Sequence, residues 1–166
     1  MWNYNDPFED CIDVSGLVAF YWNKADAWFE EDEEVFFNPK DPYRRVDYLQ
    51  SSRNVRVELN GETLAETTQP VLVIETGLPC RYYIPKQDVR QEFLQPSEKV
   101  MGSQYKGEAS YYSFSIGEEV VGDLAWYYRF PYPEAAKIAN HVCFPQGKVD
   151  LYIDGELQEK PHSRWD

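Results

Sequence analysis

The amino-acid sequence predicts a mainly β protein, a compact barrel or sandwich with one or two short helices. Short apolar or alternating segments recur at regular spacing, and turn residues separate them. Aromatic residues, which favour strands, make up 16% of the chain. With 166 residues, the chain is long enough to bury the core of a single domain.

The N-terminal quarter contains few strand signals. Residues 1–14 are polar and acidic, which predicts a segment lying loosely on the surface. Two strands are predicted between residues 15 and 29, around Trp22-Asn23-Lys24. The acidic run 30–34 is typical of a solvated face, and two prolines within 38–45 indicate a linker or a wrapped loop.

The stretch 18–28 is similar to 142–152: each contains an apolar segment, a turn with Lys and a second segment that starts near Asp. Because the rest of the unit is missing around the first copy, we predict a partial repeat over 15–52, a hairpin plus linker. A complete domain then spans 53–158, and 159–166 is a tail. An isolated hairpin is only marginally stable in water. The partial repeat is therefore predicted to pack on the main domain or to form a homodimer.

The complete domain begins with clear strand patterns. Apolar and polar residues alternate over 55–59, and Asn60-Gly61 then gives the strongest short signal for a hairpin. Further strands are predicted over 64–67, 71–75 and 81–84.

The second half of the domain continues in the same way. Residues 85–94 are predicted to form one or two turns of helix, because Pro85 is tolerated in a first helical turn. Strands are predicted over 109–116 and 120–128, a loop with one helical turn over 131–136, and a last hairpin over 142–153.

Composition excludes several classes of partner. The formal net charge of -13 argues against nucleic acid and against an anionic membrane surface, since both are bound through Lys and Arg. Cys11, Cys80 and Cys143 are odd in number and scattered, which predicts neither a disulfide framework nor a metal site, and favours a cytoplasmic setting. No motif for a nucleotide or another cofactor is present.

Several motifs of the complete domain match a known family in order and spacing. They are Asn60-Gly61-Glu62, Glu75-Thr76-Gly77-Leu78-Pro79, Tyr82-Tyr83-Ile84-Pro85, Asp88-Val89, Tyr105-Lys106-Gly107-Glu108-Ala109, Ala125-Trp126 and Asp154-Gly155-Glu156. With these motifs the chain resembles the domain of unknown function DUF427, whose members often contain two such domains in tandem. The resemblance implies strongly bent antiparallel sheets, barrel-like or tent-like. It implies no particular reaction.

The sequence departs from the family pattern at one place. The family usually has Cys-Pro before Tyr-Lys-Gly, and this chain has Ser103 and Gln104 there. A thiolate at that position would be a candidate nucleophile, so its absence removes thiol chemistry from the predictions for this chain.

Three charged residues are the candidate catalytic groups: Glu75, Lys106 and Glu108. Glu75 ends a buried apolar strand, where a carboxylate shielded from water is suited to acid–base chemistry. Lys106 and Glu108 flank Gly107 at the start of a strand, and Lys106 is a candidate acid, Schiff-base amine or anion anchor. The alternative is structural: Lys106 pairs with Glu108, or Glu75 pairs with Arg81 or Lys106, only to fix loops.

Five residues are candidates for binding a ligand: Tyr82, Tyr105, Tyr112, Trp126 and His141. Tyr82 and the next residue point to opposite sheet faces, so one of the two hydroxyl groups faces the core or a pocket. Trp126 with Tyr112 is a candidate stacking wall, and His141 lies where a loop enters the last hairpin. Core packing is the alternative for each aromatic residue, and a hydrogen-bonded loop position is the alternative for His141.

Together these residues predict a domain that binds an apolar or aromatic small molecule. If it is an enzyme, side-chain acid–base catalysis without metal or nucleotide predicts a lyase, dehydratase or isomerase. The alternative is a non-catalytic binding or interaction module in which the same residues are structural.

Overall fold

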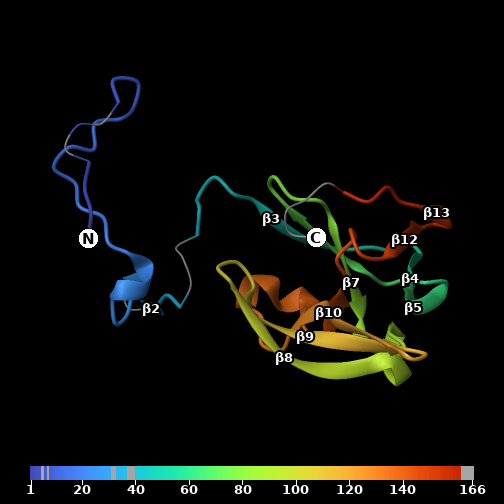
Figure 1. Ribbon diagram of the computed structural model, residues 1–166. Coiled ribbons are helices and arrows are strands. Elements are labelled where there is room, and N and C mark those ends of the chain that lie inside the picture. Colours follow the sequence, from blue (N-terminus) through green and yellow to red (C-terminus); the bar gives the residue numbers. More distant parts are fainter. Residues whose placement is uncertain (5, 7, 31–32, 37–39, 162–166) are drawn as a thin grey trace. The chain divides into compact units, whose positions relative to one another are not determined.

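The computed structural model describes residues 1–4, 6, 8–30, 33–36 and 40–161. The chain divides into a smaller unit, residues 1–39, and a larger unit, residues 40–166, and each is described by itself (Figure 1). In the part of the chain that is described, no helix is long and apolar enough to span a bilayer.

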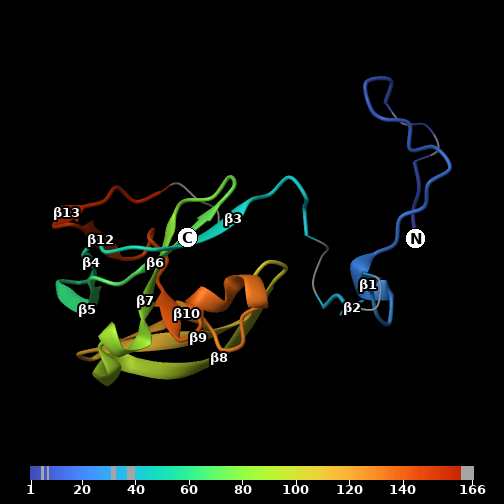
Figure 2. The same cartoon turned by 180° about the vertical axis from the view of Figure 1, so that it is seen from behind.

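The described residues of the larger unit form two antiparallel sheets, which confirms the predicted mainly β fold (Figures 1 and 2). The seven-stranded sheet has the order β3-β6-β7-β11-β10-β9-β8, and the four-stranded sheet has the order β13-β12-β4-β5. Among the described residues, both sheets end in edge strands and neither closes into a barrel. The strands are β3 (Val46–Gln50), β4 (Val55–Leu59), β5 (Glu62–Thr67), β6 (Val71–Glu75), β7 (Arg81–Pro85), β8 (Leu94–Ser103), β9 (Gly107–Ile116), β10 (Glu119–Tyr128), β11 (His141–Cys143), β12 (Asp150–Ile153) and β13 (Glu156–Leu157).

Short 3₁₀ helices and tight turns connect these strands. The helices are η2 (Lys86–Asp88), η3 (Gln91–Phe93) and η4 (Pro133–Ile138), so the expected helical turns after Pro85 and near Pro133 are present. Asn60 and Gly61 both have positive φ, as the two-residue hairpin turn between β4 and β5 requires.

In the larger unit, the strand prediction differs from the structure at three places. The prediction omits β8, because most of its residues are exposed and show no apolar pattern. It also omits β3, which lies in the stretch interpreted as a linker and pairs along its whole length with β6. The last predicted hairpin, 142–153, does not form: β11 pairs with β7 and β10, whereas β12 pairs with β4 and β13 in the other sheet.

Buried apolar residues form two cores on opposite faces of the seven-stranded sheet. One core lies between the sheets, where Val57 and Leu151 of the smaller sheet join Ile84 and Phe114 of the larger one. The second core covers the other face and includes residues of η4. Because side chains alternate along a strand, neighbouring residues belong to different cores. We call the face of the second core the cavity face.

The described residues of the smaller unit contain little regular structure. Trp22–Lys24 form the 3₁₀ helix η1, and β1 (Phe29–Glu30) pairs with β2 (Glu33–Glu34). The prediction of two strands around Trp22-Asn23-Lys24 is therefore wrong. Instead Trp22 and Trp28 stack at a centroid distance of 4.9 Å, and Trp28 Nε1 donates a hydrogen bond to the Trp22 carbonyl at 2.8 Å. Aromatic rings, not a strand pair, organise this segment.

Candidate functional site

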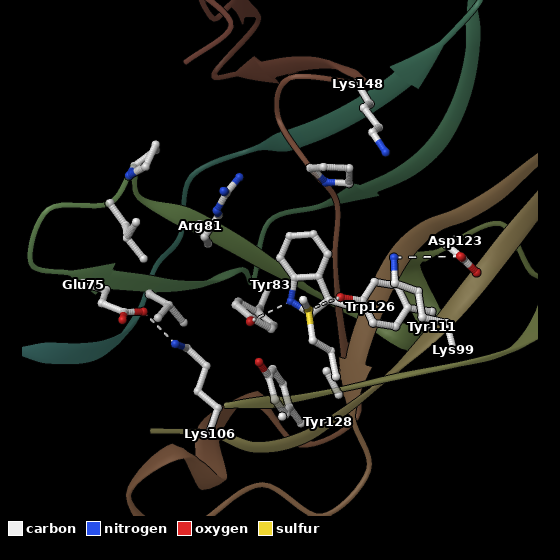
Figure 3. A pocket seen from close by; sticks show the side chains of 17 residues that line it. Glu75, Arg81, Tyr83, Lys99, Lys106, Tyr111, Asp123, Trp126, Tyr128 and Lys148 are labelled. Carbon is white, nitrogen blue, oxygen red and sulfur yellow. Dashed lines mark hydrogen bonds and ion pairs between the residues drawn. The ribbon is translucent and has the colours of Figure 1, made fainter. Parts of the chain in front are cut away.

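A cavity of about 410 Å³ opens on the cavity face of the seven-stranded sheet (Figure 3). Because residues two apart share a face, β7 contributes Arg81 and Tyr83 to it, and β10 contributes Trp126 and Tyr128. Strand β6 contributes Glu75 at its end. The loops before β7 and before β12 form the rim. We call this space the Trp126 cavity.

The Trp126 cavity contains a shielded ion pair. Lys106 Nζ lies 2.7 Å from Glu75 Oε2, and both side chains are only 10% exposed. Arg44 Nη1 approaches the other carboxylate oxygen, Glu75 Oε1, at 3.5 Å. The structure thus brings together two of the three candidate catalytic residues, although 31 positions separate them in the sequence.

A tight turn between β8 and β9 positions Lys106. Gly107 has φ +97°, and a Cβ atom there would lie 3.3 Å from the Phe130 carbonyl oxygen, so a side chain would strain this turn. The Lys106 carbonyl accepts a hydrogen bond from the Tyr132 N–H at 3.1 Å. Ser103, where the family pattern has Cys, accepts a hydrogen bond from the Tyr105 N–H at 3.3 Å. A cysteine at this position would therefore lie in the turn that presents Lys106.

Aromatic side chains form the floor and wall of the cavity. Trp126 Nε1 donates a hydrogen bond to the Tyr83 hydroxyl at 3.1 Å, and the Tyr111 ring lies 6.4 Å from the Trp126 ring. Burial raises the pKa of Tyr83, Tyr111 and Tyr128, because the charged phenolate loses its water. These hydroxyl groups are therefore protonated at neutral pH and can donate hydrogen bonds to a ligand.

The raised pKa of Tyr83 predicts a loss of stability at alkaline pH. The unfolded chain releases the Tyr83 proton near pH 10, whereas the folded chain retains it, so the free energy of unfolding falls as the pH rises above about 10. One such tyrosine contributes a slope of up to about 1.4 kcal/mol per pH unit. Tyr83→Phe should reduce the slope by about that amount in urea unfolding between about pH 10 and 12. Tyr43→Phe, at an exposed position, is the matched control, and equal slopes in both variants would contradict the prediction.

Five of the eight predicted site residues lie outside the lining of the Trp126 cavity. Glu108 is exposed, and β9 instead directs Ala109 and Tyr111 into the cavity. Tyr82 packs against the core between the sheets. The Tyr105 hydroxyl accepts a hydrogen bond from the Asp41 N–H at 3.0 Å, which fixes the start of the larger unit.

Tyr112 and His141 line a second, smaller space of about 290 Å³. Tyr112 does not form a stacking wall with Trp126; it stacks on Tyr127 at a centroid distance of 4.5 Å and accepts a hydrogen bond from Lys86 Nζ at 2.7 Å. His141 Nδ1 lies 2.8 Å from the Ala139 carbonyl oxygen. Trp126 alone of the five predicted ligand-binding residues lines the Trp126 cavity.

Sequence reasoning missed Tyr83, Tyr111, Arg81 and Lys148 as lining residues. For Tyr83, Tyr111 and Arg81, the alternation of side chains along a strand could have predicted the position. Once Glu75 and Trp126 are assigned to one face, the antiparallel register pairs Trp126 with Tyr111 and selects the odd-numbered residues of β7. Lys148 lies in a loop, and no pattern in the sequence indicated its position.

The larger unit is thus a mainly antiparallel β domain with an aromatic cavity and a shielded ion pair on one face of its larger sheet. The chain belongs to the family described as domain of unknown function DUF427, whose match spans residues 47–155, more than half of the 166 residues. The match begins within β3. No curated protein matches the chain.

Among the described residues, no group of three or more His, Cys, Asp or Glu side chains is arranged to hold a metal ion.

Proposed function

We propose that the larger unit binds a flat aromatic or conjugated small molecule in the Trp126 cavity. The observation that supports the proposal best is an ion pair at the wall of an aromatic cavity. The volume of about 410 Å³ falls within the range of small-molecule sites. Trp126, Tyr83 and Tyr111 offer ring surface for stacking, and a few polar groups can fix the orientation of the ligand.

We further propose that Glu75 and Lys106 transfer a proton on this ligand. The Glu75 carboxylate would remove a proton from a carbon next to a carbonyl group. The Lys106 ammonium would donate a hydrogen bond to the oxygen of the resulting enolate and so stabilise its charge. Return of the proton to another carbon gives an isomerisation, and departure of a leaving group from the enolate gives an elimination.

One observation favours the alternative, a binding module without catalysis. Glu75 is already engaged twice, by Lys106 at 2.7 Å and by Arg44 at 3.5 Å. Buried ion pairs of this kind also occur as purely structural elements. In that case the cavity would bind its ligand while the ion pair only joined β6 to the turn before β9.

One probe can test both steps. 2-Indanone is a flat aromatic ketone with acidic C–H groups. We expect it to shift the indole ¹H–¹⁵N resonance of Trp126, identified with Trp126→Phe, and to leave the resonances of Trp22 and Trp28 unchanged. We also expect the protein to accelerate deuterium uptake by 2-indanone in D₂O. Glu75→Gln should lower the rate of this protein-catalysed uptake by a factor of about 10²–10⁴.

The outcomes separate the two proposals. A Trp126 shift without accelerated exchange would contradict proton transfer and support the binding module. No shift of the Trp126 resonance at millimolar 2-indanone would contradict the binding proposal itself.

A further inference from the structure

A second cavity lies on the other face of the seven-stranded sheet. It is the space of about 290 Å³ that Tyr112 and His141 line, and we call it the Lys86 site. Because Tyr112 and Val142 belong to the core between the sheets, this site and the Trp126 cavity lie on opposite faces. The other side chains that line the Lys86 site are Lys86, Tyr127, Arg129 and Asn140.

Among the described residues, two cations and no carboxylate line the Lys86 site. Acidic residues outnumber basic ones by 29 to 16 in this chain, so two basic side chains without acidic partners at one site are unexpected. Neither Lys86 nor Arg129 forms an ion pair with any described residue. Asp88, the acidic residue nearest to Lys86 in the sequence, instead accepts a hydrogen bond from the Thr67 hydroxyl at 2.6 Å. The two positive charges are therefore uncompensated within the described structure.

A buried tyrosine holds the Lys86 side chain in place. Lys86 Nζ donates a hydrogen bond to the Tyr112 hydroxyl at 2.7 Å, and Tyr112 is only 7% exposed. The backbone is fixed as well, because the Lys86 N–H donates a hydrogen bond to the Asn140 carbonyl at 2.9 Å. An ammonium group has three N–H donors, so two remain for a ligand. Since the lysine is already ordered, binding a ligand costs less side-chain entropy.

Arg129 and His141 complete the polar wall of the site. Arg129 directly follows β10, and His141 begins the neighbouring strand β11. The Arg129 guanidinium offers a planar fork of donors, which matches the oxygens of a phosphate group. His141 Nδ1 lies 2.8 Å from the Ala139 carbonyl oxygen, and because a carbonyl only accepts, we assign a proton to Nδ1. Nε2 has no partner among the described residues and can bind a hydroxyl group.

A larger space of about 570 Å³ adjoins the Lys86 site and shares Lys86, Asn140 and His141 with it. In the part of the chain that the structure describes, no carboxylate lines this space either. Apart from Pro85, the rest of its lining carries hydroxyl and amide groups: Gln50, Ser51, Ser52, Thr68, Gln69 and Gln87. Such groups both donate and accept hydrogen bonds, as the hydroxyl groups of a sugar or polyol do.

We propose that the Lys86 site binds the phosphate group of a small hydroxylated molecule, such as a sugar phosphate. Lys86 and Arg129 would hold the dianion, and the adjoining space would hold the hydroxylated skeleton. The formal net charge of -13 repels anions from the chain as a whole, so a bound anion has to be held by local contacts of this kind. The proposal is independent of the proposed function of the Trp126 cavity.

The test uses three probes that share one sugar ring and differ at a single carbon. At about pH 7.5, glucose 6-phosphate carries close to two negative charges, glucuronate carries one and glucose is neutral. The chain has two histidines, so the imidazole resonances of His141 can be identified with His162→Gln and followed in the full chain at constant pH. We expect glucose 6-phosphate to bind about five- to tenfold more tightly than glucuronate, and glucose to cause no shift at the same millimolar concentrations.

Two variants test the location of the phosphate. Arg129→Gln should weaken glucose 6-phosphate about three- to fivefold, as is usual for an exposed charged contact, and should not affect folding. Tyr112→Phe should also weaken it, because Lys86 loses the hydroxyl that holds it. Arg90→Gln is the matched control: this arginine is exposed, pairs with Glu92, lies outside both spaces and should have no effect on binding.

Equal binding of glucose 6-phosphate and glucuronate would overturn the assignment of phosphate. Binding that Arg129→Gln weakens no more than Arg90→Gln would overturn its placement at this site. If inorganic phosphate bound as tightly as glucose 6-phosphate, the adjoining space would contribute nothing, and the hydroxylated ligand would be overturned. Failure of both inorganic phosphate and glucose 6-phosphate to shift the His141 resonances would overturn the whole proposal.

Discussion

Replacing Glu75 by Gln is expected to lower the free energy of unfolding by about 3–5 kcal/mol, whereas Lys106→Met should lower it by only about 1–3 kcal/mol. The asymmetry follows from Arg44. When Lys106 is removed, Glu75 retains a cation at 3.5 Å, but when Glu75 is removed, the shielded ammonium of Lys106 loses its carboxylate partner. Urea unfolding at neutral pH measures both values, and both variants should still fold.

The control is an ion pair of similar length on the surface. Lys40 Nζ lies 2.9 Å from Glu134 Oε1, but both side chains are about half exposed or more. Lys40→Met should therefore change the free energy of unfolding by less than about 1 kcal/mol. Equal losses in Glu75→Gln and Lys106→Met would show that Arg44 does not share the carboxylate. If Glu75→Gln and Lys106→Met lowered the free energy of unfolding no more than Lys40→Met does, the Glu75–Lys106 pair would contribute no stability.

Two truncations are expected to behave very differently. A chain of residues 40–166 should fold, because it retains both sheets and both cores. A chain of residues 51–166 lacks β3 and should melt about 10–20 °C lower or aggregate, since Val46 and Tyr48 pack against the second core and β3 pairs with β6. The exposed edge of β6 would then offer unpaired backbone groups to other chains. Thermal unfolding and light scattering after gel filtration measure both effects.

The same samples test the role of the smaller unit. We propose that it docks on the larger unit or pairs with a second copy, because many of its large apolar side chains are exposed, including Phe8, Ile12 and Phe20. A full chain that is dimeric while 40–166 is monomeric would support pairing. Equal stability and the same oligomeric state of the full chain and 40–166 would contradict both forms of docking. A stable, monomeric 51–166 would contradict the predicted importance of β3.

The strands of the complete domain could be predicted from the sequence because their patterns are local. Asn60-Gly61 is the strongest short sequence signal for a hairpin between two strands, and the structure has this hairpin. Which residue of an adjacent pair faces the cavity depends instead on packing. Tyr82 and Tyr83 are chemically identical, and only the position of the four-stranded sheet directs the first to the inner core and the second to the cavity.

Long-range pairing explains the other differences. Glu75 and Lys106 were candidates because of their local context, yet their contact requires β6 and the turn before β9 to meet across the cavity. Strand β8 is a sheet edge with a register shift between Pro96 and Val100, so neither an apolar run nor strict alternation marks it. The sequence similarity between 18–28 and 142–152 does not extend to the structure, since the first copy contains a 3₁₀ helix and the second contributes strands to two sheets.

The strand order also bears on how the protein folds. Strand β11, residues 141–143, lies between β7 and β10, and β12 pairs with β4, which precedes it by more than 90 positions. Neither sheet can be completed until β11 and β12, which follow most of the other strands in the sequence, have left the ribosome. Folding dominated by such distant contacts is slow, in the range of milliseconds to seconds. During synthesis, β7 and β10 would therefore present unpaired edges that are prone to aggregation, until a three-residue strand closes the gap between them.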